Sequence, residues 1–446
     1  MYLWKMASTR FQIHKRFLLA ILIICLKYVD VTEVCRVDDK DPSSTTCKFT
    51  LVESIPENLT YAPSDPILMS TYEAHKRLLL KAKKSIHLST FYWTLLSNDT
   101  SVYDNSSSQG EDIYRILTDI VKGQIVKVKI AQNNTNADTD NLAAFGAEVR
   151  TLNFTALVGA GVLHTKMWIV DQQHVYIGSG NFDWRSYTQT KETGVLIEDC
   201  PELGEDADKI FQVYWMLGTL KVIPYPWPDN FLTKINMTTP LEVNYNSSKG
   251  GVYITSSPPP FCPVGRTYDI DGIINVIRSA KKFIYISVMD YLPLFVYLNP
   301  EIYWPVIDNE LKRAAIDRKV EVRLLASHWR HTSPEMYTFL SSLSILSHAR
   351  NLNIKLYVKL FTVPAYTDIQ EQIPFARVSH SKYMVTDKHA YIGTSNWSGD
   401  YFKYTGGVAF VLKDEDCSGT PGSLRQQLQD VFVRDWQSNY TKPVFG

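Results

Sequence analysis

Apolar positions recur along most of the chain with two spacings, one typical of helices and one typical of strands. Helical spacing over residues 70–84 and 111–122 is followed each time by a short strand-like run, at 85–89 and 126–130. Two further apolar runs lie at 167–170 and 175–177. Helices that alternate with apolar strands predict an α/β sandwich with a largely buried sheet.

The same plan returns in the second part of the chain. Three pairs of segments match in the same order: Ala82–Ser89 with Ala280–Ser287, 111–130 with 304–325, and His164–Asn181 with His380–Asn396. Ordered self-similarity of this kind indicates an internal duplication. We therefore expect two homologous α/β/α sandwich halves with mixed sheets, packed about a pseudo-twofold axis around one shared active site.

Prolines and polar clusters divide the chain into five expected parts. Residues 30–64 are polar with few periodic apolar positions, and the prolines at 258–260 interrupt the middle of the chain. The expected parts are a signal peptide or signal-anchor over 1–29, a lumenal stem over 30–64, a first half over 65–225, a Pro-rich connection over 226–262 and a second half over 263–446.

The N-terminal segment has the pattern of a targeting signal. Lys15 and Arg16 directly precede an apolar run over 17–26, which is shorter than the roughly 20 apolar residues that span a membrane. This pattern predicts a signal peptide, with an uncleaved signal-anchor left open. Either one sends the rest of the chain into the secretory lumen.

Cysteines fit that oxidising compartment. We expect Cys200 to pair with Cys35 or Cys47, and Cys262 to pair with Cys417. The sequence has no Cys-x-x-Cys pair, which argues against a zinc knuckle.

Glycosylation sequons point to the same compartment. Asn-x-Ser/Thr triplets occur at Asn58, Asn98, Asn105, Asn133, Asn153, Asn236, Asn246 and Asn439. A further triplet begins at Asn396, inside a turn that we expect to be catalytic. A glycan there would block the site, so we predict none at that position.

Candidate chemistry lies in two copies of His-x-Lys-x4-Asp, each followed by a glycine turn and an Asn. The copies are His164, Lys166, Asp171, Ser179 and Asn181, and His380, Lys382, Asp387, Thr394 and Asn396. Residues i and i+2 of a strand share a face, so each imidazole points the same way as its ammonium group. This pairing suits a phosphate, because one group attacks or donates a proton while the other neutralises oxygen charge. One copy alone is usually a structural pair, but two with the same spacing predict catalysis, with Asp171 and Asp387 as supports.

With these motifs the chain resembles the phospholipase D superfamily from about Ile67 to Trp436. Longer stretches resemble its lysosomal type-three and type-four members: FYWTLLSNDT from Phe91, VLHTKMWIVD from Val162, FDWRSYTQTKETGV from Phe182, SSPPPFCPVGRTYD from Ser256 and HSKYMVTDKHAYIGTSNWSGDYF from His380. One departure is the single cysteine at 200, where these relatives tend to carry a pair. The resemblance implies a phosphodiesterase that uses no metal or cofactor and forms a phosphohistidine intermediate.

The resemblance also implies roles for individual residues. One motif histidine attacks phosphorus and the other protonates the leaving oxygen, then activates water. The non-bridging oxygens are held by Lys166, Lys382, Asn181 and Asn396, with Ser179 and Thr394 as neutral donors of the turns. Glu192 lies where the family often has an acid that orients the first-half histidine, and the equivalent second-half position falls near Thr405. We therefore favour His164 as the nucleophile.

The substrate is left open between two classes. The resemblance implies an acid 5′→3′ exonuclease on single-stranded DNA and RNA in endolysosomes, either as a type II membrane protein or in a released form. The alternative is a phospholipid hydrolase or transphosphatidylase. A net charge of +0 argues against a strongly basic surface for duplex nucleic acid. Tyr291 and residues 327–331 are candidates for stacking on a nucleotide, or else core and rim residues.

A third hypothesis, from another class, is a catalytically inactive lumenal binding protein. It is disfavoured because both histidines and both lysines of the motifs are present. The sequence leaves the oligomeric state open, a homodimer included.

Overall fold

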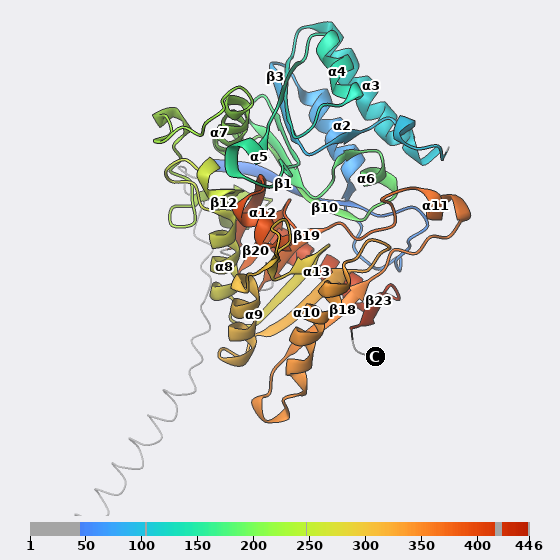
Figure 1. The fold of residues 1–446 in the computed structure, drawn as a ribbon, viewed down its shortest axis with the longest axis vertical. Coiled ribbons are helices and arrows are strands. Elements are labelled where there is room, and N and C mark those ends of the chain that lie inside the picture. Colours follow the sequence, from blue (N-terminus) through green and yellow to red (C-terminus); the bar gives the residue numbers. More distant parts are fainter. Residues whose placement is uncertain (1–44, 103–104, 247, 415–421, 445–446) are drawn as a thin grey trace, which may run out of the picture. The chain divides into compact units, whose positions relative to one another are not determined.

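The computed structural model describes residues 45–102, 105–246, 248–414 and 422–444. The expected N-terminal signal, Cys35 and Cys417 lie outside these ranges. No helix within the described ranges combines the length and the apolar character needed to cross a bilayer. Figure 1 shows the described part as layers of helices and strands, with the first-half elements in blue to green and the second-half elements in yellow to red.

The first half contributes one set of strands to a 17-stranded mixed sheet. Its order is β6-β5-β3-β7-β8-β10-β1, in which β6, β5 and β3 run parallel and every later pairing is antiparallel, with β2 beside β1 in parallel. The strands are β1 Thr45–Ser54, β2 Met69–Ser70, β3 Ser85–Thr90, β5 Lys127–Gln132, β6 Glu148–Thr151, β7 Met167–Val170, β8 His174–Gly178 and β10 Glu192–Glu198.

The second half repeats this order and these directions. Its order is β18-β17-β13-β19-β20-β22-β12, with β23 beside β18 and β11 beside β12. The strands are β11 Leu241–Tyr245, β12 Ser248–Ser257, β13 Phe283–Val288, β17 Glu321–Ser327, β18 Leu356–Phe361, β19 Lys382–Thr386, β20 His389–Gly393, β22 Gly407–Asp414 and β23 Thr441–Pro443. β1 and β11 pair in parallel and join the two sets. The mixed α/β class that the sequence predicted is confirmed.

Short strands flank the glycine turn of each motif. β4 (Trp93–Thr94) pairs with β9 (Phe182–Asp183), and β14 (Tyr291–Leu292) pairs with β21 (Trp397–Ser398). A third pair, β15 (Leu294–Phe295) with β16 (Ile302–Tyr303), belongs to the second half only.

Two of the expected boundaries were wrong. β1 lies in the segment expected to be a stem, where Phe49 and Leu51 alternate with polar residues and are buried. β11 and β12 lie in the segment expected to be a Pro-rich connection. By strand order β1 and β12 are counterparts, because each completes its half by pairing antiparallel, β1 with β10 and β12 with β22.

The helices cover the strands on both faces. They are α2 Thr71–Lys81, α3 Ser108–Gly123, α4 Ala137–Ala144, α5 Phe154–Val158, α6 Arg185–Thr188, α7 Pro201–Leu217, α8 Asp269–Ser279, α9 Val306–Ile316, α10 Pro334–Ser344, α11 Asp368–Gln372, α12 Gly399–Lys403 and α13 Leu424–Gln437. Single 3₁₀ turns are η1 Ser97–Asp99, η2 Asn105–Ser107, η3 Asp229–Phe231, η4 Pro259–Phe261, η5 Ile345–His348 and η6 Arg350–Leu352. α2 begins at a capping box in which Ser70 and Glu73 satisfy each other's backbone N–H groups.

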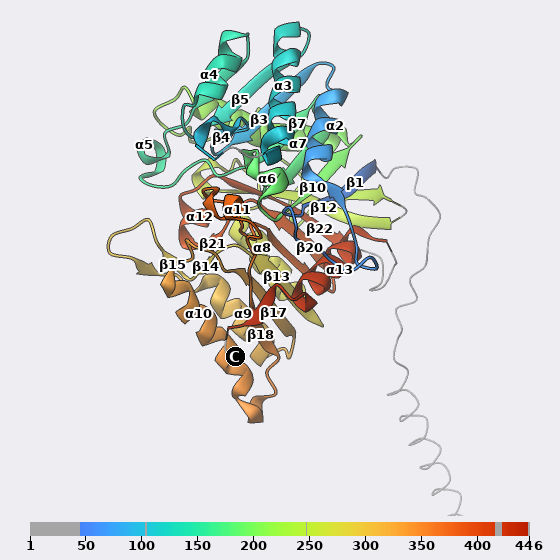
Figure 2. The same cartoon turned by 90° about the vertical axis from the view of Figure 1, so that its right-hand side faces the viewer.

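Three apolar cores follow from this layering. α2 and α3 bury one core on the first half, and α8, α9 and α10 bury another on the second. The largest core lies where the two halves meet, and strands of both sets, α7 and α13 contribute to it. α7 contacts β12 of the second half and α13 contacts β1 of the first, an arrangement visible in Figure 2. The halves are therefore packed on each other through buried apolar surface.

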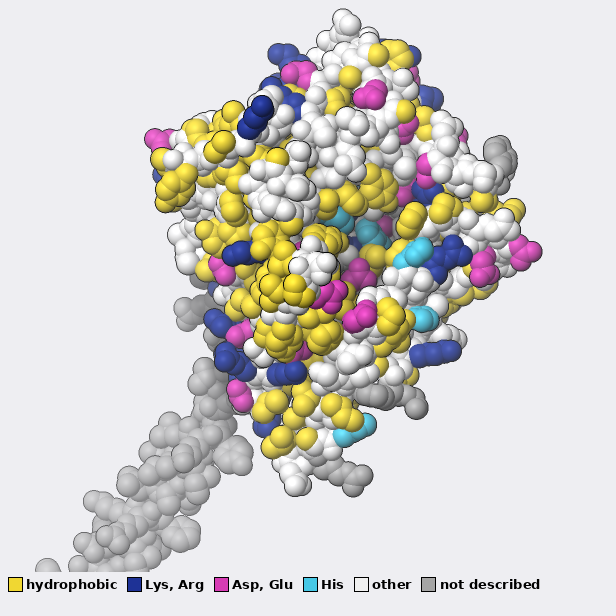
Figure 3. All heavy atoms as spheres, in the orientation of Figure 1, with side chains coloured by type: hydrophobic (Ala, Val, Ile, Leu, Met, Phe, Trp, Pro, Cys, Tyr) yellow, Lys and Arg dark blue, Asp and Glu magenta, His cyan; other side chains and the backbone are white. Residues whose placement is uncertain are grey.

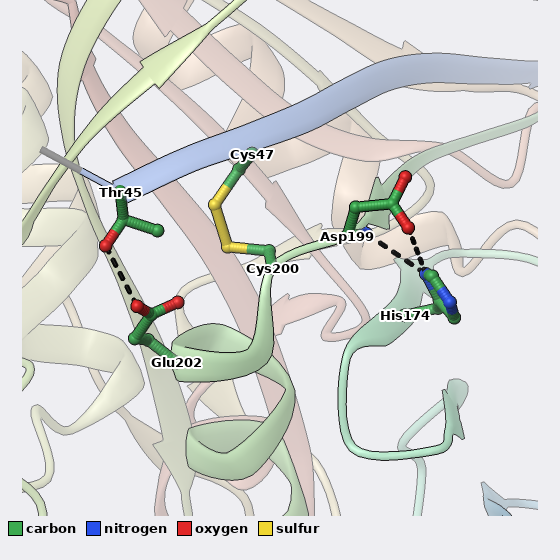
Figure 4. Close-up of a disulfide and its surroundings, with 6 residues drawn as sticks. All are labelled: Thr45, Cys47, His174, Asp199, Cys200 and Glu202. Carbon is green, nitrogen blue, oxygen red and sulfur yellow. Dashed lines mark hydrogen bonds and ion pairs between the residues drawn. A yellow bond between two sulfur atoms is a disulfide. The ribbon is translucent and has the colours of Figure 1, made fainter.

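One disulfide joins β1 to the start of α7. Cys47 and Cys200 are bonded, with their Cα atoms 4.9 Å apart (Figure 4), which confirms one of the two expected partners of Cys200. The other expected pairing is contradicted, because Cys262 carries a free thiol that bonds to the Ser256 carbonyl at 3.3 Å. Its expected partner, Cys417, lies outside the described residues.

The predicted glycosylation sites lie at or near the surface. Exposed sites are Asn58, Asn98, Asn105, Asn153, Asn246 and Asn439, and half-buried sites are Asn133 and Asn236. Asn396, where we predicted no glycan, is 4% exposed. Glycosylation itself stays a prediction.

Candidate active site

Each motif histidine is held by the backbone of the opposite half. The N–H of His164 donates to the carbonyl of Gly406, and the N–H of His380 donates to the carbonyl of Lys191, both at 2.8 Å. The bridges Leu163↔Gly406 and Lys191↔Ser379 continue these contacts. The duplicated frame thus brings two segments more than 200 residues apart to one place.

A single cavity of about 520 Å³ opens between the halves. His164, His380, Asn181, Asn396 and Glu192 all line it. Figure 3 shows a hollow on this face in which histidine and acidic side chains are visible between hydrophobic ones. The structure therefore brings these predicted site residues from both halves together.

The motif lysines lie behind the histidines. Lys166 and Lys382 are fully buried, and each Nζ donates at 2.6 Å to the carbonyl of the histidine two residues earlier. An ammonium group has three donors, so each lysine has further N–H groups for a bound anion.

The expected partner of Glu192 was wrong. Glu192 contacts His380 of the second half, with its Oε1 and Oε2 at 3.0 and 2.9 Å from Nδ1. Ser179 Oγ donates to this carboxylate at 2.5 Å and Thr190 Oγ1 at 2.7 Å. Spacing along the chain could not reveal this, because β10 begins at the interface and its first residue, Glu192, faces the other half.

His164 has a neutral partner instead. Its Nδ1 lies 2.9 Å from the carbonyl oxygen of Thr394. By strand register the counterpart of Glu192 is Gly407, not Thr405. A Cβ at Gly407 would lie 2.3 Å from Ser395 Oγ, so the second half has no room for an acid there. Only His380 is oriented by a carboxylate.

Ser179 and Thr394 do not reach the cavity, contrary to the expected phosphate contact. Both are fully buried. Ser179 Oγ accepts from the N–H of Thr193, and Thr394 Oγ1 accepts from the N–H of Val408. These hydroxyls fix the catalytic turns to the neighbouring strands.

Asp171 and Asp387 lie at the far ends of their strands and act as supports, as the sequence suggested. Asp171 accepts from the backbone N–H groups of Lys83, Lys84 and Ser85 at 2.7–2.9 Å. Asp387 accepts from those of Lys281 and Lys282 at 2.9 and 3.0 Å. Each motif Asp therefore fixes the start of the strand beside its own motif, in the repeated Ala-Lys-Lys segment.

The two turn asparagines are held by polar neighbours. Asn181 Nδ2 lies 3.1 Å from the Tyr92 hydroxyl, and Asn396 Nδ2 donates to Asp290 Oδ2 at 2.9 Å and to the Tyr401 hydroxyl at 3.3 Å. Within the described residues both Oδ1 atoms are buried without a bonded partner. The Asn181 amide keeps one N–H that is free to meet a ligand.

Sequence reasoning missed most of the cavity wall. Phe91 and Tyr92 follow β3, and Met289 and Asp290 follow β13; all four line the cavity. The repeated strands offered this signal, because residues just beyond equivalent strand ends lie at equivalent places. Tyr401 also lines the wall and packs edge-on against His164.

Of the aromatic residues proposed for stacking on a nucleotide, one lines the cavity and one is buried in the core. Trp329 lines the cavity, whereas Tyr291 is buried and donates to Asp308 at 2.9 Å. Within the described ranges no group of three or more His, Cys, Asp or Glu residues is arranged to hold a metal ion.

Comparison with known proteins identifies the family. The model of the "PLD3/4, PLD-like domain" matches residues 62–366. The chain is 48% identical to a 5′-3′ exonuclease PLD3 of Xenopus tropicalis, over 89% of this chain and 81% of that protein. It is 44% identical to human 5′-3′ exonuclease PLD3 and 42% identical to mouse 5′-3′ exonuclease PLD4, over 90% of this chain and 81% and 80% of those proteins. The chain belongs to the PLD3/4 family.

Solved structures support the fold. A phosphatidylserine synthase of Haemophilus influenzae aligns with a TM-score of 0.53 at 14% identity, over 83% of this chain and 85% of that one. As a member of the PLD3/4 family the chain is a phosphodiesterase of the phospholipase D superfamily, and the two-histidine cavity is its candidate active site.

The electrostatics of this PLD3/4 site distinguish the two histidines. Burial, Lys166, Lys382 and His380 together hold the pKa of His164 well below its ordinary value. Burial also lowers the pKa of His380, to about 4, but Glu192 opposes that shift. The pKa of Glu192 is lowered even though burial raises it, because His380 and Lys382 stabilise its charge. Burial lowers the pKa of Lys382 to about 8.

Proposed function

We propose that this protein is a 5′→3′ exonuclease that removes nucleotides from single-stranded DNA or RNA at acid pH. The observation that carries the proposal is one cavity that holds an imidazole from each half, one beside a carboxylate and the other beside a carbonyl. The names of the PLD3 and PLD4 relatives support the substrate class.

His164 is the nucleophile in this mechanism, although for a different reason from the one that spacing suggested. Its Nδ1–H donates to a neutral carbonyl, which leaves Nε2 unprotonated, and its lowered pKa keeps the ring neutral at acid pH. Nε2 attacks phosphorus, the bond from phosphorus to the leaving oxygen breaks, and a phosphohistidine forms. Water then attacks phosphorus and frees His164.

His380 is the general acid. Glu192 stabilises its protonated form, and a bound phosphodiester adds a further negative charge that raises its pKa. His380 gives its proton to the leaving oxygen and takes one back from the attacking water. Lys166 and Lys382, with the side-chain amides of Asn181 and Asn396, hold the non-bridging oxygens.

Aromatic side chains in the wall fit a nucleic acid substrate. Phe91, Trp329, Phe375 and Tyr401 line the cavity and offer ring faces to bases. The same apolar wall also fits an acyl chain, so a phospholipid substrate is the competing proposal.

We place the protein in the secretory lumen, in lysosomes or endosomes. The buried Cys47–Cys200 disulfide supports an oxidising compartment. Glycosylation of the surface sequons and anchoring by the N-terminal segment belong to the same proposal.

An oligonucleotide assay near pH 5 tests the activity. Single-stranded oligonucleotides with either the 5′ or the 3′ end blocked are compared with a phosphatidyl substrate. We expect stepwise shortening that only the 5′ block prevents. Turnover of the lipid without any shortening of the oligonucleotide would replace the nuclease by the phospholipase.

A further inference from the structure

Asp290 is an acid of the active-site cavity to which the mechanism above gives no part. It follows β13 and lines the cavity. Its Oδ2 accepts a hydrogen bond from Asn396 at 2.9 Å, and its backbone carbonyl accepts one from Trp397 at 3.0 Å. No residue that the structure describes donates to its Oδ1. Asp290 is thus fixed to the catalytic turn by one oxygen, with the other available to a ligand.

The first half has a neutral residue in the same place. Tyr92 and Asp290 each stand two residues after the end of equivalent strands, directly before the short strands β4 and β14. Tyr92 holds Asn181 through its hydroxyl, as Asp290 holds Asn396 through its carboxyl. Burial raises the pKa of Tyr92 well above its ordinary value, so this phenol stays neutral at physiological pH. Of these two equivalent positions, only the second half therefore carries a carboxyl group, whose pKa burial raises.

The surroundings of Asp290 favour its neutral form. Burial raises the pKa of its carboxyl, and Lys382 on β19 opposes that shift. The other groups that face it are the phenols of Tyr297 and Tyr401 on the second half. Across the cavity lies the Glu192–His380 pair.

A second carboxyl of the cavity, Asp183, is already fully bonded. Its Oδ1 accepts from Arg185 and its Oδ2 accepts from Tyr92. Asp183 therefore has no oxygen to offer a substrate, which leaves Asp290 as the acid with a free oxygen beside the phosphate-holding amide.

We propose that Asp290 works as a neutral acid that contacts the substrate and restricts binding to acid pH. Its Oδ2 holds Asn396 while its protonated Oδ1 donates a hydrogen bond to a non-bridging oxygen of the bound phosphodiester. An ionised Asp290 would place a second negative charge beside the phosphate and turn a donor into an acceptor that repels the non-bridging oxygen. The inference rests on the proposed phosphodiester chemistry and not on the choice of nucleic acid.

The variant Asp290→Asn tests this role. An amide keeps an acceptor for Asn396 and a donor for the phosphate, but it never ionises. We expect the decline of kcat/KM toward neutral pH, measured relative to each enzyme's own value near pH 5, to move up by about one pH unit or more in the variant, mainly through KM. A decline at the same pH as in wild type would overturn the proposal.

Tyr92→Phe is the matched control. It removes the hydroxyl that holds Asn181 and donates to Asp183, but it leaves Asp290 beside the phosphate in place, so we expect it to lower kcat/KM by a similar factor at every pH. If Tyr92→Phe shifted the pH dependence of kcat/KM as much as Asp290→Asn does, the shift would come from loosening of a turn amide and not from the charge of Asp290. That result would also overturn the proposal.

Binding of dimethyl phosphate gives a readout that needs no turnover. This probe is a monoanion over the whole range from about pH 4 to about pH 8. Wild type should lose affinity as pH rises, and Asp290→Asn should lose about tenfold less. Equal losses would contradict the role of Asp290. A wild type that cleaves no oligonucleotide yet shows this difference would end the nuclease proposal and leave the role of Asp290 intact.

Discussion

The two halves of this protein share a strand order, yet they hold their histidines in different ways. In the second half His380 meets the carboxylate of Glu192, which comes from the first half. In the first half His164 meets the carbonyl of Thr394, which comes from the second. The frame was kept after duplication, as the parallel roles of Asp171 and Asp387 show. The groups that touch the imidazoles differ between the halves, and the proposed mechanism assigns each imidazole a different role accordingly.

The same contrast extends into the core behind the catalytic turns. In the first half Ser54 donates to Thr71, a neutral residue at the start of α2. In the second half Thr255 and Tyr391 donate to Asp269, at the start of α8. Asp269 is fully buried, its Oδ2 has no bonded partner, and burial raises its pKa to about 6. The second half thus carries ionisable groups where the first half is neutral.

The largest expected effect comes from removing one histidine at a time. His164→Ala should lose about 10³-fold or more in kcat on any phosphodiester, because no nucleophile is left. His380→Ala should lose about 10²–10⁴-fold on an oligonucleotide, because the leaving oxygen needs a proton. With bis(p-nitrophenyl) phosphate, whose leaving group needs no proton, the initial burst of nitrophenolate should return in His380→Ala and not in His164→Ala. The reverse pattern of rescue would exchange the two roles.

Glu192→Gln removes the charge that distinguishes the two histidines. Gln keeps the shape, but His380 loses its anionic partner, so kcat/KM should fall about 10²-fold. Ser179→Ala is the control, since it removes one donor to Glu192 and leaves the carboxylate; it should cost less than about tenfold. Steady-state kinetics near pH 5 measures both. Equal losses in the two variants would mean that the charge of Glu192 does not matter.

The buried Asp269 should make the second half sensitive to pH. Its folded pKa of about 6 lies above the value near 3.9 of an unfolded aspartate, so the folded protein holds a proton that the unfolded chain has released. The stabilisation that this proton provides is fully present below about pH 4. As pH rises through about 6 it is lost, which lowers the free energy of unfolding by roughly 3 kcal/mol. Chemical denaturation should show that Asp269→Asn lacks this decline. Thr71→Ser, at the neutral counterpart, should keep the wild-type slope; an unchanged slope in Asp269→Asn would refute the assignment.

The smallest effects should come from the two motif aspartates. Asp171→Ala and Asp387→Ala each leave backbone N–H groups without an acceptor, which should lower the free energy of unfolding by about 1–3 kcal/mol. Turnover per folded molecule should stay close to wild type, because neither side chain lines the cavity. Loss of turnover without loss of stability in either variant would return these residues to the chemical step.

Local patterns in the sequence predicted the features of the molecule that depend on the order of neighbouring segments. The duplication, the α/β class and the meeting of His164 with His380 all follow from segments that repeat in order. β1 was missed because its partner β10 lies about 140 residues away, so nothing near Phe49 and Leu51 indicates a sheet. Glu192 was placed in the right site and beside the wrong histidine, because spacing along one chain cannot show which half a strand end faces. Asp290 carries no motif and becomes visible only as part of the wall of a cavity.

The central claim is that the two histidines have different roles in one site, with His164 as the nucleophile. The most direct measurement is to quench the enzyme during turnover of a 3′-labelled oligonucleotide and of a 5′-labelled one, and to map any phosphorylated histidine by mass spectrometry. We predict a covalent adduct on His164, and its absence in His164→Ala. An adduct on His380 in the wild-type enzyme would contradict the assignment and reverse the roles of the two halves.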